Sequence, residues 1–252
     1  VNDDDFVGNI LNGIKALTYL LLLVEGDDDD RKRVHAFKIS AKVVFFSYFC
    51  RLFLTNKSSL NRKTMGKELS EMTLEELWEL FPIFLIEPDE KWVGYYDEIA
   101  SFLQKALNDY SIERISHIGS TAIKGIWAKD IVDVLIEIPY NQDIEAVAHA
   151  MERNGFIRMS TGKSRISFNK GYTKAGYADK VYHAHLRYAG DNDELYFRDY
   201  LNEHPQIAKE YEILKLGLWK KYEHNRDAYT DAKTGFICKW TAEARKLYGE
   251  RY

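Results

Sequence analysis

The segment Ser116-His117-Ile118-Gly119-Ser120-Thr121, together with the strand that follows it, decides the fold expected of this chain. Residues 112–118 alternate between apolar and polar side chains, which is typical of a β-strand. Residues 131–138 are rich in Val and Ile and predict a second strand. A short turn joins the two strands, so the end of the first strand is expected to lie beside Asp133 on the second.

The turn itself has the composition of a phosphate-binding corner. Gly119 has no Cβ, so the backbone there can approach a phosphate closely. Ser120 and Thr121 add hydroxyl donors, and free N–H groups at the start of a helix favour an anion. A Gly-Ser-Thr tripeptide alone is most often a simple turn. Its position before the strand that carries Asp133 makes a phosphate site the sharper prediction.

Asp133 is the expected metal ligand. Mg²⁺ prefers carboxylate oxygens held rigidly beside a phosphate. A pair of acids two residues apart would be the usual arrangement, but position 135 is Leu. Glu137 is about 13 Å farther along an extended strand, and Asp130 is expected to point the other way. The acidic pair is therefore incomplete, which leaves open whether the site is catalytic.

Four further residues are candidates for the same site. His183 and His185 alternate on a predicted strand and share one face, where they could bind a metal with Asp133. Asp133 and His185 are the expected catalytic residues, whereas Lys129 and Arg198 are expected to contact phosphate. Each also has a structural explanation: hydrogen-bonded histidines on a sheet surface, a solvated lysine and a salt-bridged arginine. Lys215, Tyr229 and Lys233 could line the same cleft or simply be packing residues.

The remaining pattern predicts an α/β (α+β) fold, with a mixed sheet flanked by helices. A capping box at Thr73 and Glu76 starts a helix, and a longer helix runs from Asp89 to about residue 108. The predicted helices cover residues 74–80, 89–108 and 141–153, and the predicted strands cover residues 112–118, 131–138, 165–169 and 180–188. A short β-prone run covers residues 83–87, and a helical C-terminal region from residue 192 to about 247 is interrupted near His204-Pro205 and Asn225.

The first 64 residues differ from the rest. Two apolar runs, at residues 6–24 and 34–54, flank a charged turn and predict a helical hairpin. Each run carries a Lys near its middle, so a membrane hairpin is not expected. The acidic start is unlike a signal peptide. Residues 55–66 resemble a linker, and Met65 is the expected start of a domain that covers residues 65–252.

Composition narrows the class of protein. Of the 252 residues, 46% are apolar, which is enough for a substantial core. The net charge of −4 gives no sign of a nucleic-acid-binding protein. Cys50 and Cys238 form no CxxC pair, which argues against a structural zinc site or a disulfide framework and favours a cytoplasmic location. The oligomeric state cannot be predicted from these features.

Taken in order, several motifs resemble those of the GrpB family. They cover the chain from about Met65 to about Leu247 and comprise His117-Ile118-Gly119-Ser120-Thr121-Ala122, Ala128-Lys129-Asp130-Ile131-Val132-Asp133, Tyr182-His183-Ala184-His185-Leu186, Phe197-Arg198-Asp199-Tyr200-Leu201, His204-Pro205 with Tyr211 and Leu214-Lys215, and Tyr229-Thr230-Asp231-Ala232-Lys233. The resemblance implies a nucleotidyltransferase-like fold and carries family features onto Gly119, Ser120, Thr121, Lys129, Asp133, His183, His185 and Arg198. It implies no substrate.

Three hypotheses follow. The first is an enzyme that uses Mg²⁺ to transfer a nucleoside monophosphate from an NTP to a small acceptor. The second is a module that binds a nucleotide or a phosphorylated small molecule without catalysis, which Leu135 favours. The third is an interaction protein that docks through its N-terminal hairpin.

Overall fold

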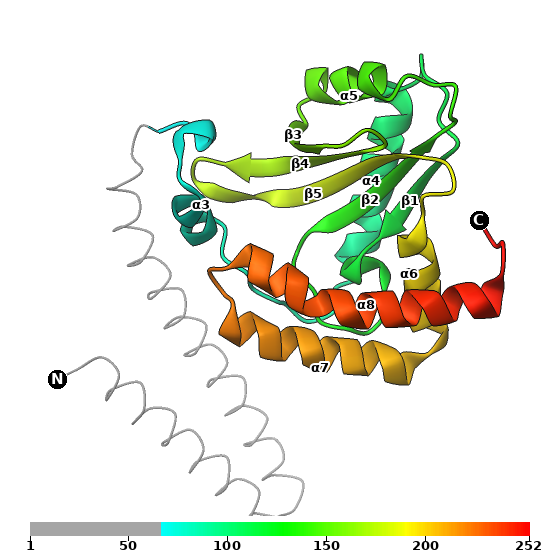
Figure 1. Cartoon of the computed structure of the whole chain (residues 1–252). Helices are drawn as coiled ribbons and strands as arrows, with labels where there is room; N and C mark the ends of the chain where they lie inside the picture. The colour runs from blue at the N-terminus through cyan, green and yellow to red at the C-terminus, as the bar shows by residue number, and fades with distance from the viewer. Residues whose placement is uncertain (1–66) are drawn as a thin grey trace, which may run out of the picture. The chain divides into compact units, whose positions relative to one another are not determined.

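The computed structural model describes residues 67–252, which are coloured in Figure 1. The predicted hairpin over residues 1–64, the linker and the predicted start at Met65 lie outside the described residues. The elements are α3 (Leu74–Leu80), α4 (Lys91–Ala106), β1 (Arg114–Ile118), β2 (Val132–Ile138), α5 (Ile144–Arg153), β3 (Ile157–Thr161), β4 (Arg165–Thr173), β5 (Gly176–Tyr188), α6 (Asp193–Glu203), α7 (Pro205–Lys221) and α8 (Arg226–Tyr248). Single 3₁₀ turns cover Leu69–Glu71 and Ser120–Ala122.

The strands form one five-stranded sheet in the order β1-β2-β5-β4-β3. Strands β2 and β5 are parallel, and the other neighbouring pairs are antiparallel. The predicted class, a mixed sheet flanked by helices with a helical C-terminal region, is therefore confirmed. The parallel pair places residues of β2 and β5 that are far apart in the sequence side by side at the centre of the sheet.

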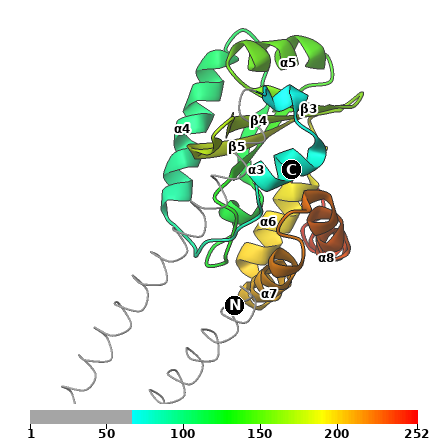
Figure 2. The same ribbon diagram turned by 90° about the vertical axis from the view of Figure 1, so that its left-hand side faces the viewer.

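Alternation along β2 separates the two faces of the sheet. Val132, Val134 and Ile136 are buried in a core with residues of α4 and α5. The intervening side chains lie on the opposite face, where Leu135 packs against Ile118 and Leu195 of α6. Figure 2 shows α4 on the other side of the sheet from α6, α7 and α8. One face of the sheet therefore supports the main core, and the other faces the C-terminal helices.

The register on that second face brings the polar residues of the strands together. Asp133 on β2 lies opposite Ile118 on β1 and His183 on β5. His183 in turn lies opposite Asn169 on β4. Because side chains alternate across a strand, Asp133 and His183 project to the same side of adjacent strands. The backbone register alone therefore places the side chains of Asp133 and His183 next to each other.

The C-terminal helices start where the sequence predicts interruptions. Helix α7 begins at Pro205, whose fixed φ and missing N–H suit the first turn of a helix. Helix α8 begins at Arg226, and the side chain of Asn225 accepts a hydrogen bond of 3.0 Å from the Ala228 N–H. No helix within residues 67–252 is both long and apolar enough to cross a membrane.

Some predicted boundaries are wrong. Strand β3 was not expected: its side chains are mostly exposed, and main-chain pairing with β4 holds it at the sheet edge. Strands β4 and β5 are longer than the predicted 165–169 and 180–188, because pairing continues past an irregularity near Lys170 to Thr173 and Gly176. The β-prone run at 83–87 contributes only a bridge between Ile86 and Ala128.

Candidate functional site

A cavity of about 170 Å³ lies where the turn after β1, the strands β2 and β5 and the C-terminal helices meet. It is lined by Leu85, Ser120, Lys129, Ile131, Asp133, His183, Lys215, Arg226, Tyr229, Thr230 and Lys233. Ser120, Lys129, Asp133 and His183 were candidate site residues from the sequence, and the structure brings them together here. Lys215, Tyr229 and Lys233, which could have been packing residues, also line the cavity.

Asp133 is held by a chain of hydrogen bonds. His183 Nδ1 lies 3.1 Å from Asp133 Oδ1. An ionised carboxylate only accepts hydrogen bonds, so Nδ1 carries the proton and Nε2 is the acceptor. Tyr172 Oη donates to that Nε2 at 2.8 Å, and Arg226 donates to the Tyr172 hydroxyl. This chain fixes the orientation of Asp133 and leaves His183 without a free nitrogen to act as a base on a ligand.

The charge states follow from the same contacts. Burial disfavours the Asp133 carboxylate, but the adjacent His183 and His185 outweigh it and keep the pKa of Asp133 well below its usual range. Burial lowers the pKa of His183, and the Arg226 guanidinium acts in the same direction against the effect of Asp133. The pair is therefore an ionised Asp133 beside a neutral His183.

The close approach of the Asp133 carboxylate requires a glycine at position 119, whether or not a ligand is bound. Its φ is +70° and its ψ is −169°, a conformation that is essentially restricted to glycine. A Cβ at this position would lie 2.3 Å from Asp133 Oδ2. The sequence explained Gly119 by the close approach of a phosphate, and the structure shows that the group in close approach is the carboxylate of Asp133.

The rest of the cavity wall is strongly basic. Lys129, Lys215, Arg226 and Lys233 line it together with a single carboxylate, Asp133. The ammonium groups of Lys129 and Lys233 lie 4.8 and 4.5 Å from the centre of the Tyr229 ring. Cation–π contacts of this kind hold both groups at the wall. The cavity therefore gathers basic side chains at one end of the sheet.

Burial lowers the pKa of each of these lysines. Burial and the nearby Lys233 lower the pKa of Lys215 to about 7, and Lys215 also donates to the Trp127 carbonyl. Burial lowers the pKa of Lys233 to about 8, with Asp133 opposing the shift and Arg226 adding to it. The pKa of Lys129 falls for the same reasons. A bound anion would favour the charged form of all three lysines, and the charged lysines would in turn stabilise the anion.

The acids that might complete a metal site are used elsewhere. Leu135 is fully buried, so the position two residues after Asp133 offers no ligand. Glu137 is also fully buried and accepts hydrogen bonds from Arg114, Asn192 and Gly190. Asp130 points away, as expected, and binds Lys91 and Trp92 of α4. The cavity therefore offers a Mg²⁺ ion one carboxylate, Asp133, where two acids would be the usual arrangement.

The three residues of the predicted metal set lie close together in the structure. His185 Nε2 is 3.7 Å from Asp133 Oδ1, the same oxygen that contacts His183, so the three side chains approach one another directly. Within residues 67–252, no group of three or more His, Cys, Asp or Glu side chains is arranged to hold a metal ion. A metal bound by Asp133, His183 and His185 therefore stays a prediction.

The candidates Thr121, His185 and Arg198 lie outside the cavity lining. The hydroxyl of Thr121 contacts His117 Nε2 at 3.0 Å and the Ile131 carbonyl at 3.3 Å, so it joins the turn to the next strand. His185 Nδ1 faces Ser167 at 3.5 Å. Neither side chain lines the cavity, and both make contacts within the sheet and its first turn, so the phosphate contact of Thr121 and the catalytic role of His185 stay predictions.

Arg198 also has a different role from the one expected. Its guanidinium donates to the His117 carbonyl at 2.8 Å, to Tyr252 at 3.1 Å and to Asp199 at 2.7 Å. These contacts tie α6 to the end of β1 and to the chain terminus. The alternative explanation of Arg198 as a structural arginine is the one that these contacts favour, because each of its three nitrogens donates to a group of the fold.

Arg226 is the residue of the cavity that the sequence did not suggest. It opens α8 directly after the interruption at Asn225, and its guanidinium contacts both Tyr172 and His183. The first two turns of α8 present Tyr229, Thr230 and Lys233 on the same side, at the spacing of helix neighbours. The predicted interruption near Asn225 was the signal that could have identified Arg226. In a helix that starts there, Arg226 and Lys233 lie on one face.

Comparison with known proteins places this site in a family. A family model described as GrpB protein matches residues 82–243, which is most of the described chain, and the chain belongs to this family. Glutamate-rich protein GrpB of Alkalihalophilus pseudofirmus is 32% identical over 162 residues, covering 62% of this chain and 91% of that protein. UPF0157 protein YqkA of Bacillus subtilis is 32% identical over 170 residues, covering 65% of this chain and 48% of that protein.

A solved structure shares the fold. The conserved protein GrpB from Enterococcus faecalis matches with a TM-score of 0.57 and 30% identity, over 66% of this chain and all of that one. The Cid1 poly(U) polymerase matches with a TM-score of only 0.37 and 11% identity, which supports no conclusion about this chain. The family and fold class predicted from the sequence are therefore confirmed.

Proposed function

We propose that this protein binds the phosphate group of a small phosphorylated molecule, such as a nucleotide, in the basic cavity beside Asp133. The observation that carries the proposal is the wall itself: Lys129, Lys215, Arg226 and Lys233 surround a space whose one carboxylate is already engaged by His183. Phosphate bound by Arg and Lys forms short, charge-assisted hydrogen bonds, which are about twice as strong as neutral ones.

Size and position agree with a single phosphate. The cavity volume of about 170 Å³ is close to the roughly 150 Å³ of a cavity that encloses benzene, and a phosphate group is smaller than benzene. The first turns of α8 also face the cavity, and the positive end of a helix favours an anion. Ser120, at the turn after β1, adds a hydroxyl to the same wall.

Mg²⁺-dependent transfer of a nucleoside monophosphate from an NTP to a small acceptor is less well supported. It needs a Mg²⁺ ion beside the phosphate, whereas four basic side chains line the cavity and its one carboxylate, Asp133, already accepts a hydrogen bond from His183. Of the three hypotheses from the sequence, binding of a phosphorylated ligand without a metal is the one that the arrangement of charges favours.

The binding test is a calorimetric titration with inorganic phosphate, pyrophosphate and ATP in buffer that contains EDTA. We expect binding without any metal, and we expect Lys233→Met to weaken it at least about tenfold, because one charge-assisted hydrogen bond is lost. Lys246→Met on the same helix is the matched control, since the Lys246 side chain is 72% exposed and pairs with Glu243. Absence of binding, or equal effects of the two substitutions, would contradict the proposal.

A second assay separates binding from transfer. The protein is incubated with each NTP, Mg²⁺ and a panel of hydroxyl and amine acceptors, and pyrophosphate release is measured. We expect no release above the buffer control. Release that disappears in Asp133→Ala would show that the cavity catalyses transfer, and the proposal of metal-free binding without catalysis would then be wrong.

A further inference from the structure

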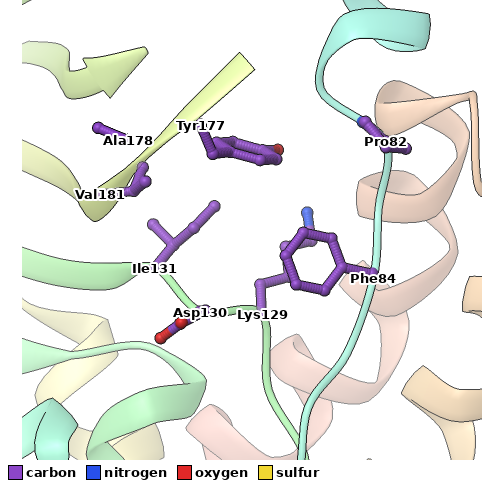
Figure 3. A pocket seen from close by; sticks show the side chains of 8 residues that line it. All are labelled: Pro82, Phe84, Lys129, Asp130, Ile131, Tyr177, Ala178 and Val181. Atoms are coloured by element: carbon purple, nitrogen blue, oxygen red, sulfur yellow. The ribbon is translucent and has the colours of Figure 1, made fainter. Parts of the chain in front are cut away.

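A second, smaller cavity adjoins the basic one. It has a volume of about 50 Å³ and is lined by Pro82, Phe84, Lys129, Asp130, Ile131, Tyr177, Ala178 and Val181. Lys129 and Ile131 line both cavities, so the two spaces share a wall. Figure 3 shows the side chains of Phe84, Tyr177 and Ile131 around this smaller space. We call it the apolar slot.

The side-chain oxygens of Asp130 and Tyr177 at the apolar slot are already hydrogen-bonded. The Asp130 carboxylate accepts hydrogen bonds of 2.9 Å from Lys91 and 2.8 Å from Trp92. The Tyr177 hydroxyl donates to the Phe81 carbonyl at 3.3 Å. The other lining side chains, apart from Lys129, are hydrocarbon. A group that enters the slot therefore meets mainly apolar surface, and a hydroxyl there would exchange its several hydrogen bonds to water for at most the Lys129 amine.

The volume limits what can enter. An enclosed cavity of about 150 Å³ holds one benzene molecule, so a slot of about 50 Å³ takes only a chain of about two or three carbons or one edge of a ring. Phe84 and Tyr177 lie edge to face, with ring centres 6.1 Å apart, and leave no gap for a ring stacked between them. A nucleobase would remain mostly outside the slot.

From these observations we infer that the ligand is a phosphate ester with a short apolar group close to the phosphate, and that this group occupies the apolar slot while the phosphate occupies the basic cavity. The inference rests on the proposed function, since it assigns the ester part of the same ligand. It assigns recognition to the hydrocarbon next to the ester oxygen rather than to a sugar or a base.

The test compares n-propyl phosphate with glycerol 3-phosphate, which have the same carbon chain and differ by two hydroxyl groups. Titration of the full chain should give an affinity for propyl phosphate at least about tenfold higher than for glycerol phosphate, because a hydroxyl group that enters the slot loses its hydrogen bonds to water. Equal affinities, or tighter binding of glycerol phosphate, would overturn the inference. If inorganic phosphate also fails to bind, the proposed function itself is wrong.

Two substitutions locate the effect in the apolar slot. Phe84→Ala removes one wall and should abolish the preference for propyl phosphate while the affinity for inorganic phosphate stays unchanged. Ala178→Leu narrows the slot from the opposite strand and should have the same result, which guards against misfolding of the first variant. Retention of the full preference in both variants would show that the alkyl chain binds elsewhere and would also overturn the inference.

Discussion

Gly119 and Asp133 depend on each other at the scale of single residues. The glycine adopts a backbone conformation that other residues avoid, and its missing Cβ leaves the space that the Asp133 carboxylate fills. The hydrogen bond to His183 then holds that carboxylate in the charged form. A single methyl group at position 119 would therefore disturb both the turn and the one acid of the site.

Gly119→Ala should lower the free energy of unfolding by about 1–3 kcal/mol from backbone strain, with a further loss because Asp133 must move. Gly94→Ala is the control: Gly94 lies in α4 with no atom near its Cβ position, and alanine there should raise stability by up to about 1 kcal/mol. Urea denaturation measures both. Similar effects of the two substitutions would contradict the close contact with Asp133.

Lys233 gives the site a pH dependence. Burial lowers its pKa to about 8 in the free protein, and a bound anion raises that pKa because it favours the charged amine. Binding therefore takes up protons: the affinity is greatest below pH 8 and falls as the pH rises above 8. Sulfate is the suitable probe because it does not titrate in this range.

The measurement is a sulfate titration by calorimetry between pH 6.5 and 9.5, in two buffers that differ in ionisation enthalpy. We expect proton uptake near pH 8 and a decline in affinity of at most about tenfold per pH unit for each proton taken up. Lys233→Met should reduce the uptake, and Lys215, with a pKa of about 7, and Lys129, whose pKa burial also lowers, account for the part that remains. Affinity that does not change with pH would contradict this account.

At the scale of elements, the start of α8 determines the basic cavity. Asn225 caps the helix, and Arg226, Tyr229 and Lys233 follow on its first turns and line the cavity. The sequence predicted this interruption, and the capping chemistry explains why. It did not show where the helix packs, because a helical repeat specifies which residues share a face and not which strand that face meets.

Asn225→Ala should reduce stability by about 1 kcal/mol and also weaken phosphate binding, because fraying of the first turn displaces Arg226 and Lys233. Asp143→Ala is the matched control. Asp143 caps α5 through a hydrogen bond of 2.9 Å to the Glu145 N–H, and α5 contributes no residue to the basic cavity. Its loss should lower stability to a similar degree with no change in phosphate affinity, and calorimetry of both variants makes the comparison.

At the scale of the whole molecule, stability and binding reside in different polar groups of the same sheet face. Glu137, fully buried on β2, joins Arg114 of β1 to Asn192 and Gly190, which precede α6. Asp133 lies on the same strand and the same face but points into the basic cavity. Glu137 stabilises the fold through its hydrogen bonds, whereas Asp133 lines the basic cavity.

Glu137→Ala should lower the free energy of unfolding by about 3 kcal/mol, because three hydrogen-bond donors lose a buried acceptor. Phosphate affinity of the folded protein should not change. Glu113→Ala, at an exposed position next to β1, should leave both quantities near their original values. Denaturation and titration of both variants decide the matter, and a loss of phosphate affinity in Glu137→Ala would contradict the separation.

The sequence by itself determined the strands that carry Asp133 and His183, the interruptions of the C-terminal helices, the incomplete acidic pair at Leu135 and the family. These follow from alternation, capping and motif order, which are local properties. Only the tertiary structure decided that Arg226 and Lys233 line the same cavity as Asp133, that Gly119 makes room for a carboxylate and that Arg198 joins α6 to the end of β1. The physical reason is that the charged side chains of the site come from elements that are distant in the sequence. Only long-range packing brings those elements together.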